Sequence, residues 1–187
     1  MVISAIILAA GESKRFGALK QIYRIDGAPI LQIIIDKIVP LFSEVILVVG
    51  YKKDDILSQL DLPKSVRVIF NPDYSLGMGT SLSCGVKSLH RSISHFAIFL
   101  SDMPYIKIET IDKLLNTLGK GKEIVAPIYK GKRGFPVFFS HHFIDDLKNL
   151  KKDKGARGLI KREKKYLRLI DISDPGVIKD IDEKKDL

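Results

Sequence analysis

The stretch VISAIILAAGESKRFGALKQ, residues 2–21, joins a run of apolar residues to a loop rich in glycine and positive charge. The apolar run is short, continuous and β-branched, which predicts a buried strand. Gly11 and Gly17 frame the loop that follows, which carries Arg15 and Lys20. Glycine lets backbone N–H groups approach an anion, and arginine and lysine add charge. This stretch therefore predicts a first strand that ends in an anion-binding loop.

The alternation of apolar runs with helical segments continues along the chain. Runs rich in valine, isoleucine and phenylalanine predict strands, and apolar residues at helical spacing predict helices between them. The predicted strands are residues 2–8, 44–49, 66–70, 96–100, 123–128, 135–139 and 167–171. The predicted helices are residues 29–40, 53–61, 80–91, 107–118 and 141–150. This order predicts an α/β fold over residues 1–187, a single domain whose mostly parallel sheet is covered by helices on both faces.

The strand predicted at 135–139 is the expected exception to the parallel order. It contains Pro136, which has no N–H to donate and must lie at the start of a strand or on an edge. We therefore expect this strand to run antiparallel to its neighbours.

Composition narrows the class of protein. Hydrophobic residues make up 45% of the 187 residues, which is enough for one globular core. No apolar run approaches the roughly 20 residues that span a bilayer, and the start of the chain lacks the basic cluster of a signal peptide. Cys84 is the single cysteine, so we expect no internal disulfide and a cytoplasmic protein without a membrane partner. The net charge of +9 suits anionic ligands, but the basic run at 148–168 lacks interleaved aromatic residues and predicts a solvated helical face, so nucleic acid is not an expected partner.

Polar side chains follow three of the predicted strands, at the edge where ligands bind in open α/β sheets. The loop after the first strand contains Lys20, Asn71 follows the third strand, and Asp102 follows the fourth. We expect these three side chains to converge on one rim of the sheet. Taken alone, Asp102 could equally be a helix N-cap. The first loop matches neither the Walker A pattern nor the dinucleotide-binding fingerprint, although its composition suits an anion.

The motifs together carry a family resemblance that runs from end to end of the chain. LAAGESKRFGALKQ, which begins at Leu8, resembles the signature LAAGxSxRxGxxK of the MobA-like nucleotidyltransferases, and in particular their molybdenum cofactor cytidylyltransferase branch. The later segments that resemble this branch are NPDYSLGMGTSLSCGV (71–86), SDMPYI (101–106), GKRGFPVFF (131–139), DKGARGLI (153–160) and VIKDIDEKKDL (177–187). The tail departs from the family pattern, because Glu183 and Lys184 replace the usual Thr-Pro, but Asp180 and Asp182 are in place.

The resemblance implies a single Rossmann-like domain with a nucleotide-diphospho-sugar transferase-like fold, and a transfer reaction. CMP would pass from CTP to the phosphate of molybdenum-loaded molybdopterin, giving molybdopterin cytosine dinucleotide and pyrophosphate. The implied cofactor is Mg²⁺, held by Asp102 and Asp182, and the implied further partner is a recipient molybdoenzyme or its chaperone. The implied catalytic residues are Lys20, Arg15 and Asp102. The residues implied to bind the nucleotide are Leu8, Ala9, Ala10, Gly11, Arg15, Lys20, Asn71 and Ser81, with Gly134 and Pro136 on the acceptor side.

Three alternatives stay open. A guanylyltransferase, which uses GTP on the same acceptor, usually shows LAGG where this chain has Ala9-Ala10-Gly11. A catalytically silent protein that only binds and delivers the cofactor need not keep Lys20 or Asp102. A nucleic-acid-binding protein is suggested by net charge alone. We expect CTP to be preferred to GTP, because the Cβ of Ala10 narrows the space beside the base.

Overall fold

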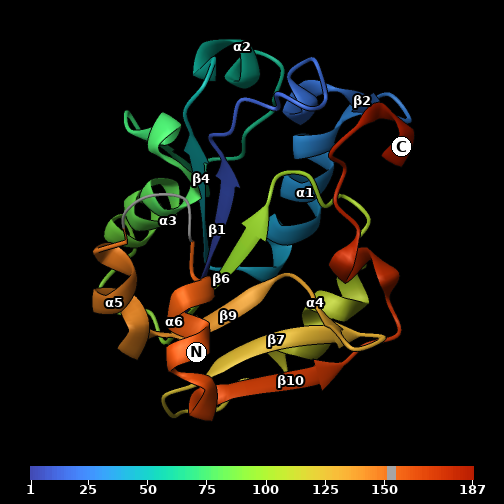
Figure 1. Cartoon of the computed structure of the whole chain (residues 1–187). Coiled ribbons are helices and arrows are strands. Elements are labelled where there is room, and N and C mark those ends of the chain that lie inside the picture. The colour runs from blue at the N-terminus through green and yellow to red at the C-terminus, as the bar shows by residue number, and fades with distance from the viewer. Residues whose placement is uncertain (151–154) are drawn as a thin grey trace.

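The computed structural model describes residues 1–150 and 155–187 of the chain. Its eight-stranded sheet has the order β10-β7-β9-β6-β1-β4-β5, with β8 paired to β7 (Figure 1). The strands of this sheet are β1 (Ile3–Ala9), β4 (Glu44–Val49), β5 (Val66–Phe70), β6 (His95–Leu100), β7 (Ile124–Tyr129), β8 (Lys132–Arg133), β9 (Val137–Ser140) and β10 (Leu167–Asp171). A short hairpin, β2 (Arg24–Ile25) and β3 (Ala28–Pro29), forms a second sheet that the sequence pattern does not predict.

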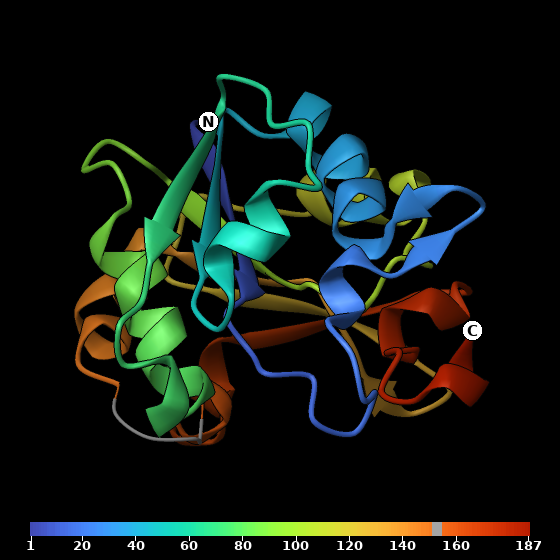
Figure 2. The same cartoon turned by 90° about the horizontal axis from the view of Figure 1, so that it is seen from above.

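Helices cover both faces of the large sheet (Figures 1 and 2). The helices are α1 (Ile30–Ile38), α2 (Lys53–Leu57), α3 (Met78–Lys87), α4 (Ile108–Leu115), α5 (Ile144–Lys148) and α6 (Arg157–Arg162). Helices α1 and α4 pack on one face, with Ala5 and Ile7 of β1, and α3, α5 and α6 pack on the other, with Ile6 and Leu8. Successive residues of β1 point to opposite faces of the sheet. Because both faces are buried, nearly every residue of this strand must be apolar.

The predicted fold class is confirmed, and so is the antiparallel exception. The pairs β1–β4, β1–β6, β4–β5 and β7–β10 are parallel. Strand β9 runs antiparallel to both β6 and β7. Pro136 directly precedes β9, so its missing N–H falls outside the ladder even though β9 lies inside the sheet.

Several element boundaries differ from those predicted. Helix α2 ends at Leu57 and α4 at Leu115, each before the predicted end, and both are followed by turns. The basic run at 148–168 contains α6, which buries Leu159 and Ile160 and leaves its cations toward solvent, as a solvated helical face does. The first two residues of the DKGARGLI segment lie outside the described residues. Of the helices in the described residues, none has the length and apolarity needed to cross a bilayer.

Candidate active site

The carboxyl ends of β1 and β6 open into a cleft of about 530 Å³. The loop after β1, the start of α3, the loop after β6 and the C-terminal tail all contribute to its walls. This is the edge of the sheet where open α/β folds bind their ligands. Of the residues predicted to bind the nucleotide or metal, those that line the cleft are Leu8, Ala10, Gly11, Arg15, Lys20, Ser81, Asp102 and Asp182.

Lys20 is the central cation of this cleft. It begins the 3₁₀ turn η1 (Lys20–Ile22), directly after the glycine-framed loop. Its Nζ donates to Asp102 Oδ2 at 2.6 Å, to Ile181 O at 3.1 Å and to Asp182 Oδ1 at 3.4 Å. The Lys20 side chain is only 13% exposed, so its charge is held largely out of water by these oxygens. The first loop and the tail, predicted separately, therefore meet at one ammonium group.

Arg15 reaches the same tail carboxylate from the open side of the cleft. Its guanidinium nitrogen Nη1 lies 2.7 Å from Asp182 Oδ2. Unlike Lys20, the Arg15 side chain is 70% exposed, so water screens this ion pair and it contributes little to stability. An exposed guanidinium next to an open cleft is free to exchange its partner for an anionic ligand.

Asp102 has a largely buried carboxylate, 18% exposed, with one oxygen that accepts no hydrogen bond among the described residues. Its Oδ1 is buried and has no hydrogen-bond partner among the described residues, while Oδ2 accepts from Lys20. Burial raises the pKa of Asp102 above its ordinary value, and the nearby Lys20 ammonium partly offsets this. The alternative reading as a helix N-cap is wrong, since α4 begins at Ile108 and the residue at its N-cap is Lys107.

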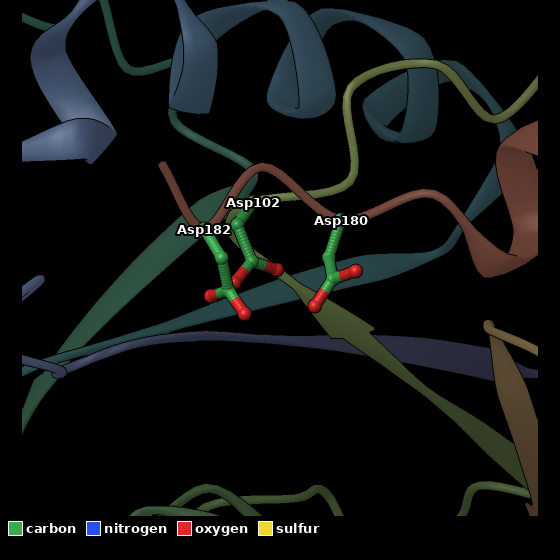
Figure 3. A group of neighbouring side chains, drawn as sticks. All are labelled: Asp102, Asp180 and Asp182. Carbon is green, nitrogen blue, oxygen red and sulfur yellow. The ribbon is translucent and has the colours of Figure 1, made fainter. Parts of the chain in front are cut away.

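Asp180 joins Asp102 and Asp182 in one acidic group, as Figure 3 shows. One carboxylate oxygen of each of the three residues lies within 4.8 Å of those of the others. Carboxylate oxygens are the ligands that a hard divalent cation prefers, and Asp102 Oδ1 is an acceptor without a donor. The residues therefore fit a divalent cation. The sequence analysis did not place Asp180 in the site, although alternate residues of an extended tail point to the same side.

A buried hydrogen-bond network holds the C-terminal tail against the loop after β6. The carboxylate of Asp174 is buried and accepts hydrogen bonds from Gly176 N, Lys107 N and Thr110 Oγ1, at 2.8, 2.9 and 2.8 Å respectively. Farther along, Ile181 is fully buried and its N–H donates to Asp102 O at 2.9 Å. These contacts fix the path of the tail and so place Asp182 in the cleft wall.

The last residues of the tail are ordered by a turn of their own. Residues 184–186 form the 3₁₀ turn η8, and Asp186 Oδ2 accepts from Asp182 N at 3.0 Å and from Glu183 N at 2.8 Å. These two backbone bonds lower the pKa of Asp186 below its ordinary value. Glu183 and Lys184, which depart from the family pattern, therefore still leave the backbone of Asp182 held.

Gly134 and Pro136, predicted to shape the acceptor side, do not line the cleft. A Cβ added to Gly134 would lie 2.1 Å from Val177 O, and Phe135 N donates to that same oxygen at 2.8 Å. Glycine is required at position 134 because the backbone of the tail approaches it too closely for a Cβ atom. The acceptor role of these residues stays a prediction.

Two residues predicted to bind the nucleotide lie behind the cleft wall. Ala9 is fully buried in the core. Asn71 is 3% exposed, its Nδ2 donates to Thr80 Oγ1 and Ser81 Oγ, both at 3.0 Å, and its Oδ1 accepts from Asp73 N at 3.0 Å. Because both amide hydrogens are used, Asn71 fixes the start of α3 and Ser81, and its nitrogen could donate to a nucleotide only by giving up one of these bonds. The nucleotide contact of Asn71 stays a prediction.

The backbone of the first loop is open toward a ligand. Gly17 has a left-handed φ of 74°, which favours glycine, whereas a Cβ on Gly11 would meet no atom within 4 Å. Gln21 is the residue of this loop that the sequence analysis missed. It is 1% exposed, and its side chain bonds back to the loop backbone. A buried glutamine beside a glycine loop could have been suspected only from its position next to Lys20.

The chain is similar to several known proteins and to a known family. A family model described as "MobA-like NTP transferase domain" matches residues 5–167. The molybdenum cofactor cytidylyltransferase of Escherichia coli strain K12 is 29% identical over 138 residues, covering 74% of this chain and 70% of that protein. The nicotine blue oxidoreductase of Paenarthrobacter nicotinovorans is 26% identical over 190 residues, covering 96% of this chain and 92% of that protein. The crystal structure of an Rv0371c homologue from Mycobacterium sp. strain JC1 has a TM-score of 0.87 and 26% identity, covering 98% of this chain and 92% of that chain.

Proposed function

This chain belongs to the MobA-like NTP transferase family, and we propose that it transfers CMP from CTP to the phosphate of molybdenum-loaded molybdopterin. The products are molybdopterin cytosine dinucleotide and pyrophosphate. The observation that carries the proposal is that Lys20 and Arg15 meet Asp102 and Asp182 beside a glycine-framed loop in one cleft. Such a cleft offers cations for phosphates and carboxylates for a divalent cation. The similarity to the cytidylyltransferase of Escherichia coli supports the choice of substrates.

The reaction joins two anions, so the site must neutralise charge. An acceptor phosphate oxygen forms a bond to the α-phosphorus of CTP as the bond from that phosphorus to the β-phosphate oxygen breaks, and pyrophosphate leaves with the electron pair. Catalysis of this kind rests on positioning and electrostatic stabilisation. Lys20 and Arg15 exchange their carboxylate partners for triphosphate oxygens, and the open amides near Gly11 donate to the same phosphates.

Asp102 and Asp182 would hold Mg²⁺, with Asp180 as a third carboxylate at its side. Bound there, the metal supplies positive charge at the reacting phosphates. Asp102 suits this role because Lys20 leaves one of its oxygens unpaired. The ammonium group of Lys20, which contacts both Asp102 and Asp182, offsets the repulsion between these two carboxylates.

The choice of CTP over GTP rests on the loop Ala9-Ala10-Gly11. Ala10 lines the cleft at a position where the guanylyl branch has glycine, and we propose that its methyl group leaves less room for a purine. Ser81, also in the cleft wall, is held by Asn71 and offers a fixed polar group. GTP remains the alternative nucleotide. We further propose that residues 1–187 act as a single cytoplasmic domain whose product passes to a molybdoenzyme or its chaperone.

One assay tests the proposal against its rivals. The purified protein is incubated with Mg²⁺, molybdenum-loaded molybdopterin and each of the four nucleoside triphosphates, and pyrophosphate and the nucleotide product are measured. We expect pyrophosphate and molybdopterin cytosine dinucleotide with CTP. Equal or faster turnover with GTP would move the protein to the guanylyl branch. Binding of molybdopterin without turnover would indicate a delivery protein. One relative is an oxidoreductase, so a further arm of the assay contains NADH or NADPH. We expect no oxidation of either.

A further inference from the structure

Gln21 is a buried polar side chain that lines the cleft and packs against its first loop. It is 1% exposed, and it follows Lys20 in the turn η1. Its Nε2 donates to Gly11 O at 2.9 Å and to Ala9 O at 3.4 Å, and its Oε1 accepts from Ser13 Oγ at 3.1 Å. A buried amide is costly unless it is hydrogen-bonded, and all of these bonds end on the loop.

The bonds fix the direction in which the loop backbone points. Two carbonyl oxygens can face only the NH₂ end of the amide, so the orientation of Gln21 is determined. The carbonyl groups of Ala9 and Gly11 are thereby turned inward, toward Gln21. The N–H groups of Gly11, Glu12 and Ser13 have no hydrogen-bond acceptor within residues 1–150 and 155–187, and all three residues line the cleft.

Ser13 shows that this loop shape needs support. Its φ is 54°, a left-handed conformation that a residue with a Cβ seldom adopts. The hydrogen bond from its hydroxyl to Gln21 holds this conformation. The turn η1 therefore has two roles. Lys20 places its ammonium group in the cleft, and Gln21 holds the loop backbone through hydrogen bonds.

We infer that Gln21 is a positioning residue that holds residues 11–13 in the shape that binds the phosphates of the nucleotide. Gln21 acts through the loop amides, which need their carbonyl groups turned away from the anion. This inference rests on the proposed function, since it takes the triphosphate as the ligand of the loop. It assigns to Gln21 the affinity for phosphate and not the affinity for the base.

The test substitutes Gln21 and a matched glutamine. Gln21→Met keeps the length of the side chain and removes every hydrogen bond. Gln32→Met is the control, because Gln32 also bonds a backbone carbonyl, Asp61 O at 3.0 Å, but lies on α1 and does not line the cleft. Calorimetry measures binding of inorganic tripolyphosphate and of CTP, each with Mg²⁺, and ligand-observed NMR measures binding of cytidine.

We expect Gln21→Met to weaken tripolyphosphate and CTP binding by about tenfold or more, with cytidine binding unchanged, and Gln32→Met to leave all three unchanged. Wild-type affinity for tripolyphosphate in folded Gln21→Met would overturn the inference, and so would an equal loss for cytidine, which would indicate a collapsed cleft. If wild-type protein binds neither tripolyphosphate nor any nucleoside triphosphate, the proposed function fails as well.

Gln21→Glu decides the matter if Gln21→Met does not fold. A carboxylate still accepts from Ser13 but cannot donate to Gly11 O, whereas the protonated acid regains one donor. Relative to wild type at each pH, we expect weak tripolyphosphate binding at about pH 8 that recovers toward pH 6, because burial beside carbonyl oxygens favours the protonated form. A constant ratio to wild type across this range would contradict the inference.

Discussion

Strand β6 has an ionisable group at each end, and the surroundings of these two groups differ. His95 begins the strand and lies beside Glu123, whereas Asp102 follows the strand and pairs with Lys20. Both ends bury polar atoms that have no hydrogen-bond partner in the described part of the chain, namely both ring nitrogens of His95 and Oδ1 of Asp102. Nε2 of His95 is 3.3 Å from Glu123 Oε1 but outside hydrogen-bond geometry. Burial alone therefore does not mark a site.

The difference lies in the carboxylates. Oε1 of Glu123 accepts a hydrogen bond from Gly119 N, and Oε2 forms an ion pair with Arg168 Nη2 at 3.0 Å. At the opposite end, Asp102 and Asp182 share the two cations Lys20 and Arg15, and Asp180 has no ion pair among the described residues. Oδ1 of Asp102 is buried without a donor, and Asp102 lines a cleft of about 530 Å³. The cleft end has unused electrostatic capacity and the His95 end has a satisfied carboxylate. We take the first as a ligand site and the second as a structural pair.

Substituting Asp102 by Asn should give the largest effect and should separate activity from stability. We expect turnover to fall by about a hundredfold or more, roughly 2.7 kcal/mol, because the charge that holds the metal is lost. Since burial raises the pKa of Asp102, its ionised form is disfavoured in the folded state, and the neutral Asn should leave the melting temperature equal or higher. Steady-state kinetics and thermal melts measure the two effects. A fully active, folded variant at ordinary Mg²⁺ would refute the metal role, and added Mn²⁺ should restore part of the loss.

Removing either cation of the cleft should have a smaller effect on the same side of the comparison. Lys20→Ala and Arg15→Ala should each lower turnover by at least about tenfold, or about 1.4 kcal/mol. The loss should be greater for Lys20, which is 13% exposed and touches both carboxylates, than for Arg15, which is 70% exposed. Lys14→Ala is the control, since Lys14 lines the cleft but pairs with Glu12 at 2.7 Å. If Lys14→Ala lost as much activity as the other two, the effect would be one of general charge.

At the His95 end, we expect a substitution to lower stability and to leave turnover unchanged. Glu123→Gln should lower the free energy of unfolding by about 1 kcal/mol, because the ion pair with the half-exposed Arg168 is lost, and should leave turnover unchanged. Urea denaturation and the kinetic assay above measure both quantities. A loss of turnover without a loss of stability would show that this end, too, takes part in function.

The smallest expected effect is a pH dependence that belongs to His95. Burial lowers the pKa of His95 below its ordinary value of 6.5, with Glu123 raising it and His141 and His142 lowering it further. The unfolded chain therefore takes up a proton near pH 6.5 while the folded chain does so only at lower pH, so stability is lost as pH falls below about 6.5. Urea denaturation between about pH 5 and 8 should show this slope in wild type and a weaker one in His95→Gln. Identical slopes would remove His95 as the cause.

Local patterns in the sequence were sufficient for seven of the eight strands of the large sheet, but they did not indicate the short strand β8. Continuous apolar runs such as β4 (Glu44–Val49) can be stable only when both faces are covered, and this physical need is visible in neighbouring residues. Likewise Pro136 marked the strand that breaks the parallel order. The family resemblance, carried by motifs that occur in order along the chain, predicts that Lys20, Asp102 and Asp182 belong to one site.

What only the tertiary structure decided is which of these groups touch and which way the others face. Lys20 is 82 residues from Asp102 and 162 from Asp182, so their pairing depends on the tail crossing back over the loop after β6. The same crossing explains Gly134, and side-chain direction explains why Asn71 supports the wall and Gln21 braces the loop. Periodicity is written in adjacent residues and can be read locally. A contact between distant segments exists only after the core has packed, because burial and hydrogen-bond satisfaction are settled there for all segments at once.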